Sequence, residues 1–385
     1  MRKVAVIGIG QTKIEEHWEK SLRDLAGEAA LSAMEDAELT QVDGLYIGNM
    51  MSGSANRQQH LGAYIADWVG LRFKEAIHLE SACSSGAAAF RAALLAISSG
   101  DIDSAMVVGA EKMSDSPISE ITTSLATAAD ADWEVTQGLS FVALNALIMQ
   151  RYMHEYRWNH SDFAEFSINA HNNAINNPFA RFHMPITREQ FEKSGMVADP
   201  ISLLDASPTG DGAAAIVLVP IEKIHPKHTE RIISIVGSAA ATDTLSVQNR
   251  KDPLWLSAAE VSAKMAYSQA GITPKDIDLF EYHDAFTIMC ALSLEACGFA
   301  ERGQAPRMAK EGDISLKGHL PAATLGGLKA RGHPVGATGV YQIVETVQQL
   351  RGRAGENQLE NARIGMAQNI GGSGSNIITH ILRIE

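Results

Sequence analysis

Three short segments carry the side chains best suited to nucleophilic and acid–base chemistry: Cys83 in SACSSG, His283 in EYHDAF and His333 in RGHPVGATG. A thiolate is a strong nucleophile, and an imidazole exchanges its proton near neutral pH. The apolar pattern after Cys83 predicts a helix that begins at this residue. Because a helix N-terminus carries free amides and partial positive charge, we expect it to lower the pKa of the Cys83 thiol. The alternative is an inert buried thiol, the commonest state of a free cysteine.

The two histidines lie at predicted junctions between secondary-structure elements. His283 follows a short apolar run and so stands at the carboxyl end of a predicted strand, where α/β folds bind ligands. A core histidine bonded to the backbone is the alternative. Five glycines surround His333 and permit close approach of other backbone, while Pro334 fits the first turn of a helix. Both histidines are therefore candidates for acid–base roles.

Neighbouring residues receive supporting or structural roles. Asp284 is expected to be the N-cap of a helix that begins immediately after it. Residues 366–376, MAQNIGGSGSN, are predicted to form a turn between two strands that can present the amide of Gly371 to an oxyanion. Cys290 and Cys297 lie on an apolar helical stretch, so we expect them to be structural.

The composition excludes several classes of protein. Apolar residues make up 45% of the 385 residues, which suffices for large buried cores. A net charge of −13 without a basic block argues against a nucleic-acid or membrane partner. Three cysteines without a CxxC pair exclude a disulfide framework and a cysteine-built zinc site. With no signal peptide and no apolar window of about 18 residues, we expect a cytoplasmic protein without a metal or other cofactor.

Strands alternate with helices along the chain, which predicts an α/β fold with mainly parallel strands. The spacing of apolar residues predicts a helix at residues 21–38, and short apolar runs predict buried strands at residues 4–10, 42–48, 77–79 and 105–109. Residues 114–199 differ, because Asn, His, Arg and aromatic residues replace the apolar runs. The strand pattern resumes at Asp205, and residues 225–231, HPKHTER, are typical of a solvated linker.

Four pairs of similar segments occur in the same order, which predicts two copies of one α/β unit. The distance between paired segments falls by about 88 residues at the fourth pair, as an insertion in the first copy would cause. We therefore predict a first half at residues 1–113 and 200–224, an inserted loop domain at 114–199 and a second half at 225–385. Cys83 and His333 then hold equivalent places at two helix starts, which a pseudo-twofold axis can bring together. Chance likeness of short apolar strands is the alternative.

The motifs SACSSG, HDAF, GHPVGATG and NIGGSGS, in this order, resemble those of the thiolase superfamily along essentially the whole chain. The chain is most similar to archaeal acetoacetyl-CoA thiolases and to the sterol-carrier-protein type, which carry His-Asp where degradative thiolases carry Asn-Glu. The resemblance implies a thiolase fold. In that fold two duplicated α/β halves form a five-layered αβαβα core, to which an inserted loop domain is added.

The resemblance also implies roles for the site residues. Cys83 is the nucleophile that takes an acyl group from a coenzyme A (CoA) thioester, and His333 takes the thiol proton and later helps to position the thioester oxygen. His283 replaces the usual asparagine and contributes with His333 to a first oxyanion hole. The amides of Cys83 and Gly371 form a second oxyanion hole around the acyl-enzyme carbonyl. The inserted domain holds CoA, with its arginines as candidate phosphate contacts.

The chain departs from the family pattern at three positions. Most thiolases have a second catalytic cysteine where this chain has Asn369, and the sterol-carrier type has a cysteine where it has Ala285. Ala323 replaces a usual asparagine. By elimination, His283 is expected to be the base that removes the α-proton, with Asp284 and Asn369 in supporting roles.

The implied activity is that of an acetyl-CoA C-acetyltransferase. It condenses two acetyl-CoA to acetoacetyl-CoA and CoA, and feeds mevalonate and isoprenoid synthesis. The family implies a homodimer or tetramer and, in archaeal relatives, a complex with HMG-CoA synthase bridged by a small zinc-ribbon/OB-fold protein. Two alternatives remain: a decarboxylating ketoacyl-synthase-like enzyme, and a non-catalytic thiolase-like scaffold or acyl-CoA-binding subunit.

Overall fold

The first half of the chain forms a five-stranded sheet from apolar segments such as GAAAIVLVP, whose residues are buried on both faces. A computed structural model describes residues 2–224 and 232–385. The strand order is β3-β2-β4-β7-β1. The strands are β1 (Val4–Gln11), β2 (Gly44–Gly48), β3 (Glu75–Leu79), β4 (Ala105–Glu111) and β7 (Gly212–Pro220). The predicted linker at residues 225–231 lies outside the described residues.

The second half repeats this topology. Its strands are β8 (Ile233–Thr242), β9 (Leu279–Glu281), β10 (Ile364–Gly371) and β11 (Asn376–Ile384). The order β9-β10-β11-β8 matches β2-β4-β7-β1, with the same parallel first pair and the same antiparallel pairs after it. Two residue pairs between β1 and β8 join the halves into one nine-stranded sheet. The predicted duplication is therefore confirmed.

The expectation of mainly parallel strands is wrong. Three strand pairings in the large sheet are parallel, namely β2–β3, β2–β4 and β9–β10, whereas the other five are antiparallel. The connections explain part of this difference. Residues 372–375 alone join β10 to β11, and a connection this short can only return the chain in the antiparallel direction.

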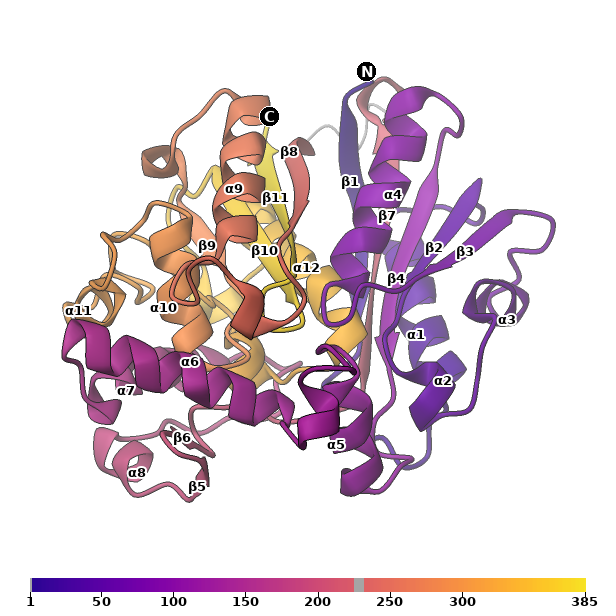
Figure 1. Cartoon of the computed structure of the whole chain (residues 1–385). Helices are drawn as coiled ribbons and strands as arrows, with labels where there is room; N and C mark the ends of the chain where they lie inside the picture. Colours follow the sequence, from indigo (N-terminus) through magenta and orange to yellow (C-terminus); the bar gives the residue numbers. More distant parts are fainter. Residues whose placement is uncertain (1, 225–231) are drawn as a thin grey trace.

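Helices and sheets alternate in five layers. Helices α4 (Ser85–Ser99) and α12 (Thr338–Arg351) lie between the two halves of the sheet, as Figure 1 shows. On the outside, α1 (Leu22–Asp36) and α3 (Leu61–Trp68) cover the first half and α9 (Ser257–Ala270) covers the second. The structure also contains the short helix α2 (Ser52–Ala55) and, beside the second half, α10 (Thr287–Ala296) and α11 (Ala305–Lys310).

The two central helices touch at their N-terminal turns because small residues stand there. A Cβ atom on Gly339 would lie 2.5 Å from the backbone nitrogen of Ala87, and one on Gly86 would lie 2.8 Å from the Gly336 carbonyl oxygen. Neither contact is tolerated, so only glycine permits this approach. Residues 82–99 have the length and mean hydropathy, 1.2, of a membrane span, but 61% of this segment is buried between the sheets as a core helix.

The predicted insertion contains helices and one small sheet. Its elements are α5 (Ile118–Ala126), α6 (Phe141–Tyr156), α7 (Ala164–Ala174), α8 (Arg188–Glu192) and β5 (Met196–Ala198), which pairs with β6 (Ile201–Ser202). In Figure 1 most of these elements lie beneath the second half. The buried hydroxyl of Tyr152 on α6 donates to Glu295 of α10 at 2.5 Å, which fixes the insertion to this half.

Candidate active site

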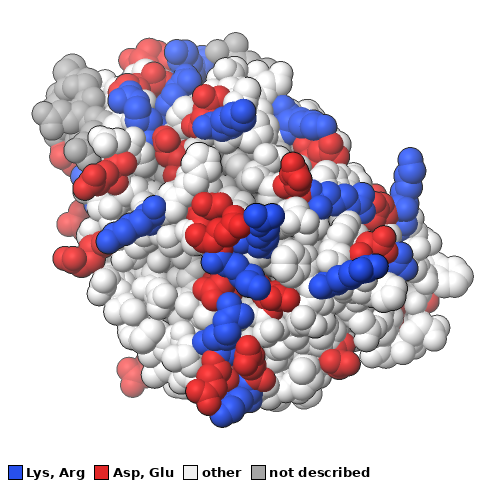
Figure 2. Space-filling view, turned by 90° about the vertical axis from the view of Figure 1, so that its left-hand side faces the viewer, with Lys and Arg blue, Asp and Glu red and all other residues white. Residues whose placement is uncertain are grey.

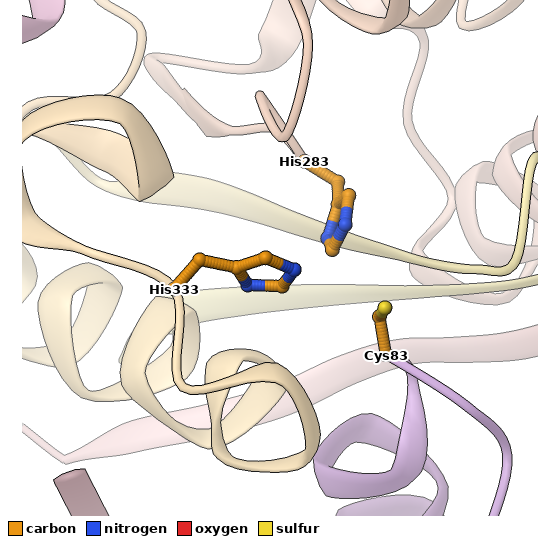
Figure 3. A group of neighbouring side chains, drawn as sticks. All are labelled: Cys83, His283 and His333. Atoms are coloured by element: carbon orange, nitrogen blue, oxygen red, sulfur yellow. The ribbon is translucent and has the colours of Figure 1, made fainter. Parts of the chain in front are cut away.

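Three side chains from distant parts of the chain converge at the centre of the molecule. Cys83 immediately precedes the first turn of α4, His283 follows β9 and His333 precedes α12. The Cys83 sulfur and one ring nitrogen of each histidine all lie within 4.8 Å of one another, and all three residues are buried (Figure 3). The imidazole rings meet edge to face with centroids 5.1 Å apart. The structure thus brings together the three residues that the sequence singled out.

The turn that presents Cys83 is strained and pinned by serines. Ala82 has a φ of 48°, in the left-handed region that residues with a side chain rarely adopt. The Ser84 hydroxyl donates to the Ser81 carbonyl at 2.6 Å, and the Ser85 hydroxyl donates to the Ala82 carbonyl at 2.6 Å. Strain of this kind costs about 1–3 kcal/mol and persists where the surroundings enforce it. Here it directs the thiol away from α4 and toward the histidines.

The electrostatic environment of Cys83 differs from the expected one. Burial, followed by the negative charge of Glu111, raises the pKa of the thiol to about 12. The amides of Cys83 itself and of Gly372 act in the opposite direction and are outweighed. The expectation of a lowered pKa is therefore wrong: the resting residue is a thiol. The sequence singled out Gly371, and the neighbouring amide of Gly372 was missed; an oxyanion role for Gly371 stays a prediction.

His333 is neutral and held by the first turn of α12. Its Nδ1 atom lies 2.7 Å from the Thr338 hydroxyl oxygen, and the hydroxyl donates to the Pro334 carbonyl at 3.2 Å. Burial, His283 and the positive charge of Arg331 hold the His333 pKa well below its ordinary value. Since Nδ1 faces Thr338, Nε2 is the nitrogen that faces Cys83 and His283 (Figure 3).

His283 is also neutral, because burial and the charge of Arg331 lower its pKa to about 3. The amide nitrogen of Asn369, on β10, lies 2.9 Å from His283 Nδ1 and 2.9 Å from Gln342 Oε1 on α12. Asn369 therefore contacts one of the histidines directly, in the place where most thiolases are expected to carry a cysteine. Gln342 was not singled out in the sequence, where it is one buried position on an amphipathic helix.

Asp284 does not cap a helix, so this expectation is wrong. Helix α10 begins at Thr287, with Phe286 as its N-cap. The Asp284 carboxylate instead accepts hydrogen bonds from the backbone nitrogens of Leu328 at 2.7 Å and Lys329 at 3.3 Å. These residues belong to a single π-helical turn that precedes His333, so Asp284 links the two histidine segments.

Two buried charged residues near the site were missed in the sequence. Arg331 pairs with Glu345 of α12 at 2.7 Å, with both side chains at most 1% exposed. Glu111, at the end of β4, accepts hydrogen bonds from the backbone nitrogens of Met50, Met51 and Gly336. Burial raises the Glu111 pKa to about 7. A signal existed for Glu111, since an acidic residue at the carboxyl end of a buried strand commonly lies near a ligand site in α/β folds.

The same three atoms would also suit a transition metal, since zinc favours thiolate and imidazole ligands. The acyl transfer that the resemblance implies would instead require the thiol and the histidine nitrogens to be free of metal, and nothing in the structure decides between the two. The absence of a metal or other cofactor therefore stays a prediction.

The arginines of the insertion, candidates for CoA phosphate contacts, are mostly paired. Arg151 pairs with Glu155 at 2.8 Å, and Arg188 pairs with Glu165 at 2.6 Å. Arg181 pairs with Glu16 of the first half at 2.8 Å. Figure 2 shows the face toward the left of Figure 1, where basic and acidic side chains alternate without an extended basic patch. Which of these arginines would contact the CoA phosphates therefore stays open.

Comparison with known proteins agrees with this architecture. Residues 4–222 match the family model "Thiolase, N-terminal domain", and residues 239–384 match "Thiolase C-terminal domain-like". An acetyl-CoA acetyltransferase of Methanothermobacter thermautotrophicus is 44% identical over 383 residues, and one of Methanocaldococcus jannaschii is 38% identical over 390, each covering 99% of both chains. The solved Ltp2-ChsH2(DUF35) aldolase superposes with a TM-score of 0.85 at 26% identity, covering 99% of this chain and 98% of that chain. The chain therefore belongs to the thiolase family.

Proposed function

We propose that the chain is an acetyl-CoA acetyltransferase that condenses two acetyl-CoA into acetoacetyl-CoA and CoA through an acetyl-Cys83 intermediate. The convergence of Cys83, His283 and His333 within 4.8 Å carries this proposal. The acetyltransferase names of two archaeal relatives that match along their full length support it.

In the first half-reaction of this proposal, Cys83 is the nucleophile and His333 is the general base. The Cys83 sulfur attacks the thioester carbonyl while His333 Nε2 takes the thiol proton. Since thiol and imidazole are both neutral at rest, this proton transfer accompanies the attack. Amides around Cys83 stabilise the tetrahedral oxyanion. The oxyanion then collapses, and the departing CoA thiolate receives the proton from His333.

Intact-mass spectrometry after incubation with acetyl-CoA tests the proposal. The unmodified protein is expected to gain one acetyl group, and Cys83→Ala is expected to gain none. Cys290→Ala is the matched control, because Cys290 is an equally buried cysteine that lies on α10, outside the convergent group. Absence of an adduct on the unmodified protein, or an adduct on Cys83→Ala, would overturn the nucleophile assignment.

The physiological setting is part of the same proposal. Thiolysis of acetoacetyl-CoA is favoured over its synthesis, so net condensation requires a consumer of the product. HMG-CoA synthase, bridged by a small zinc-ribbon/OB-fold protein and leading to mevalonate and isoprenoids, would fill this role for a homodimer or tetramer of the chain. Light scattering tests the oligomer, and co-elution with these two proteins from the same source tests the complex.

Two other functions predict different results. A decarboxylating ketoacyl-synthase-like enzyme would turn over malonyl-CoA without cleaving acetoacetyl-CoA. A non-catalytic scaffold or acyl-CoA-binding subunit would bind acetyl-CoA without forming an adduct on Cys83. The acetyltransferase names of the archaeal relatives favour the thiolase reaction over both.

A further inference from the structure

The orientation of one buried glutamine is fixed by its surroundings. Gln342 Nε2 lies 3.0 Å from each of three backbone carbonyl oxygens, those of Glu281, Tyr282 and Gln368. Carbonyl oxygens only accept hydrogen bonds, so the amide nitrogen must occupy this side. The reverse orientation would bring four oxygen atoms together in a buried space. Gln342 Oε1 therefore faces the opposite direction, toward Asn369.

The orientation of Gln342 determines the orientation of the Asn369 amide, which in turn determines the tautomer of His283. Because Gln342 Oε1 can only accept, Asn369 must present its NH2 group to it, at 2.9 Å. The second hydrogen of the same NH2 group then points to His283 Nδ1, also at 2.9 Å. His283 Nδ1 must therefore be the nitrogen without a proton. The neutral ring carries its proton on Nε2, on the side of the reacting groups.

His333 is held in the opposite tautomer. The Thr338 hydroxyl donates to the Pro334 carbonyl, so its oxygen is left to accept from His333 Nδ1 at 2.7 Å. Nδ1 then carries the proton and Nε2 carries the lone pair. The site thus pairs one imidazole that donates a hydrogen bond with one that can take up a proton, although both are neutral.

We propose, on the basis of the proposed function, that Gln342 and Asn369 are positioning residues that hold His283 as an Nε2–H donor. His283 then cannot be the base for the α-proton, and the unprotonated Nε2 of His333 cannot donate to the thioester oxygen, which revises two expectations drawn from the sequence. The place of His283 in the reaction is to donate to the thioester oxygen of the second acetyl-CoA. The base is His333 Nε2, the histidine nitrogen that keeps a lone pair toward the substrate.

The second half-reaction balances with these roles. His333 Nε2 takes a proton from the methyl group of acetyl-CoA, and the C–H electron pair forms an enolate whose oxygen accepts from His283 Nε2–H. The enolate carbon attacks the carbonyl of acetyl-Cys83 and forms the new C–C bond. The tetrahedral intermediate expels the Cys83 thiolate, which takes the proton from His333. The products are acetoacetyl-CoA and the free thiol.

Asn369→Asp separates a donor role of His283 from a base role through the sign of a pH dependence. A carboxylate at this position accepts from His283 Nδ1–H and raises the pKa of the imidazole. At low pH the imidazolium keeps its Nε2–H, whereas at high pH the neutral ring has its proton on Nδ1 and loses the donor. Condensation by Asn369→Asp should therefore fall as pH rises. A base role predicts the opposite, because deprotonation would create the base.

The other groups that face His283 define what else titrates in this experiment. The charged or titratable side chains around it are Cys83 before α4, His333 and Arg331 before α12, and Glu281 and Asp284 on its own segment. Acetylation of Cys83 is measured in parallel, because it requires His333 but not the His283 donor. The condensation rate of Asn369→Asp is therefore divided by its acetylation rate at each pH, so that an effect of the His283 charge on Cys83 and His333 is separated from loss of the donor.

Gln342→Met tests whether the contact from Gln342 to Asn369 holds the His283 tautomer. Gln349→Met is its matched control. Both glutamines are buried on α12; Gln349 Nε2 donates to the Asn357 carbonyl at 2.9 Å and Gln349 Oε1 accepts from the Leu359 nitrogen at 3.0 Å. Gln342→Met leaves Asn369 free to reverse, so condensation should fall about 100-fold, as on loss of an oxyanion donor. Gln349→Met should lose stability and keep its condensation rate. Equal condensation rates in the two variants would overturn the positioning role of Gln342.

Nitrogen-15 NMR of histidine-labelled protein reads the tautomer without any assay of activity. His283→Gln identifies the signals of His283 by their absence. The unmodified protein should show His283 with a protonated Nε2 and an unprotonated Nδ1; the reverse pattern would refute the inference even if the variants fail to fold. If acetyl-Cys83 never forms, the proposed function fails while this measurement still decides the tautomer. If it forms and Asn369→Asp gains activity with pH, the inference alone fails.

Discussion

Cys83 should react with iodoacetamide far more slowly than a free cysteine at moderate pH. Burial and Glu111 raise its pKa from 9.0 to about 12. At pH 8 the thiolate fraction is then about 10⁻⁴, against about 10⁻¹ for an unperturbed thiol, a difference of roughly 1,000-fold. The more basic thiolate is intrinsically more nucleophilic, which recovers about 20-fold. The expected rate is therefore roughly 50-fold below that of a model thiol.

The assay measures how fast the peptide containing Cys83 is alkylated, with N-acetylcysteine as the reference thiol. The rate should rise about tenfold per pH unit from pH 7 to pH 10, without levelling off. Poor access to the buried sulfur would lower the rate at every pH but would not move the pH at which it levels off. A plateau below about pH 9 would refute the reasoning, because it would mean that the helix start and the Gly372 amide outweigh burial.

Glu111→Gln identifies the charge that contributes to this shift. Removing the negative charge should lower the Cys83 pKa and move the rising part of the rate–pH curve to lower pH. Glu295→Gln is a matched control, because Glu295 is also buried but bonds to Tyr152 and does not act on Cys83. An equal displacement of the curve in both variants would assign the effect to general loosening of the core.

Two further predictions concern the contact between the halves. Gly339→Ala should lower the free energy of unfolding by about 1–3 kcal/mol and reduce condensation, because the new Cβ would lie 2.5 Å from the Ala87 nitrogen and 2.6 Å from Asn369 Oδ1; urea unfolding and turnover measure the two effects. At pH 9, where the Glu345 carboxylate is charged, Arg331→Met should lower the free energy of unfolding by about 3–5 kcal/mol, because it leaves this buried charge without its partner. The pKa of Glu345 is already raised to about 8, so its contribution to stability is present below pH 4.5 and lost as pH rises toward 8. Without Arg331 the Glu345 pKa rises further. The loss of unfolding free energy in Arg331→Met should therefore be larger at pH 9 than at pH 6, and an equal loss at the two pH values would contradict this pH dependence.

The duplicated fold could be predicted because it depends on local patterns. Buried strands, a helix after each of Cys83 and His333, and a common order of repeats are all visible along the chain, and the observed topology pairs the same elements. The convergence of these two residues followed from symmetry alone. The short Gly-Ser turn between β10 and β11 also favours antiparallel pairing of these two strands, because so short a connection can only reverse the chain.

The expectations that the structure contradicts, for Asp284 and for the Cys83 pKa, depended on contacts between segments that are distant in the chain. In the sequence, Asp284 is as good an N-cap candidate as any aspartate before a helix. Only the position of residues 327–331 in the fold shows that backbone nitrogens of this segment donate to its carboxylate. The sign of the Cys83 pKa shift required two quantities that a sequence does not contain. These are the depth of burial and the approach of Glu111 from the end of β4.

Asn369 stands where the resemblance to thiolases implies a second catalytic cysteine, and this constrains the proton transfers of the proposed mechanism. An amide cannot take up a proton, so the proposed condensation uses a lone pair on one of the three convergent side chains. In this mechanism acetylation would occupy the sulfur of Cys83, and Asn369 occupies the Nδ1 lone pair of His283. His333 Nε2 is then the lone pair left among the three, and in the proposed mechanism the same atom serves both half-reactions. In the proposed mechanism Gln342 thereby assigns the base role to His333 and not to His283, because it fixes the direction in which Asn369 donates.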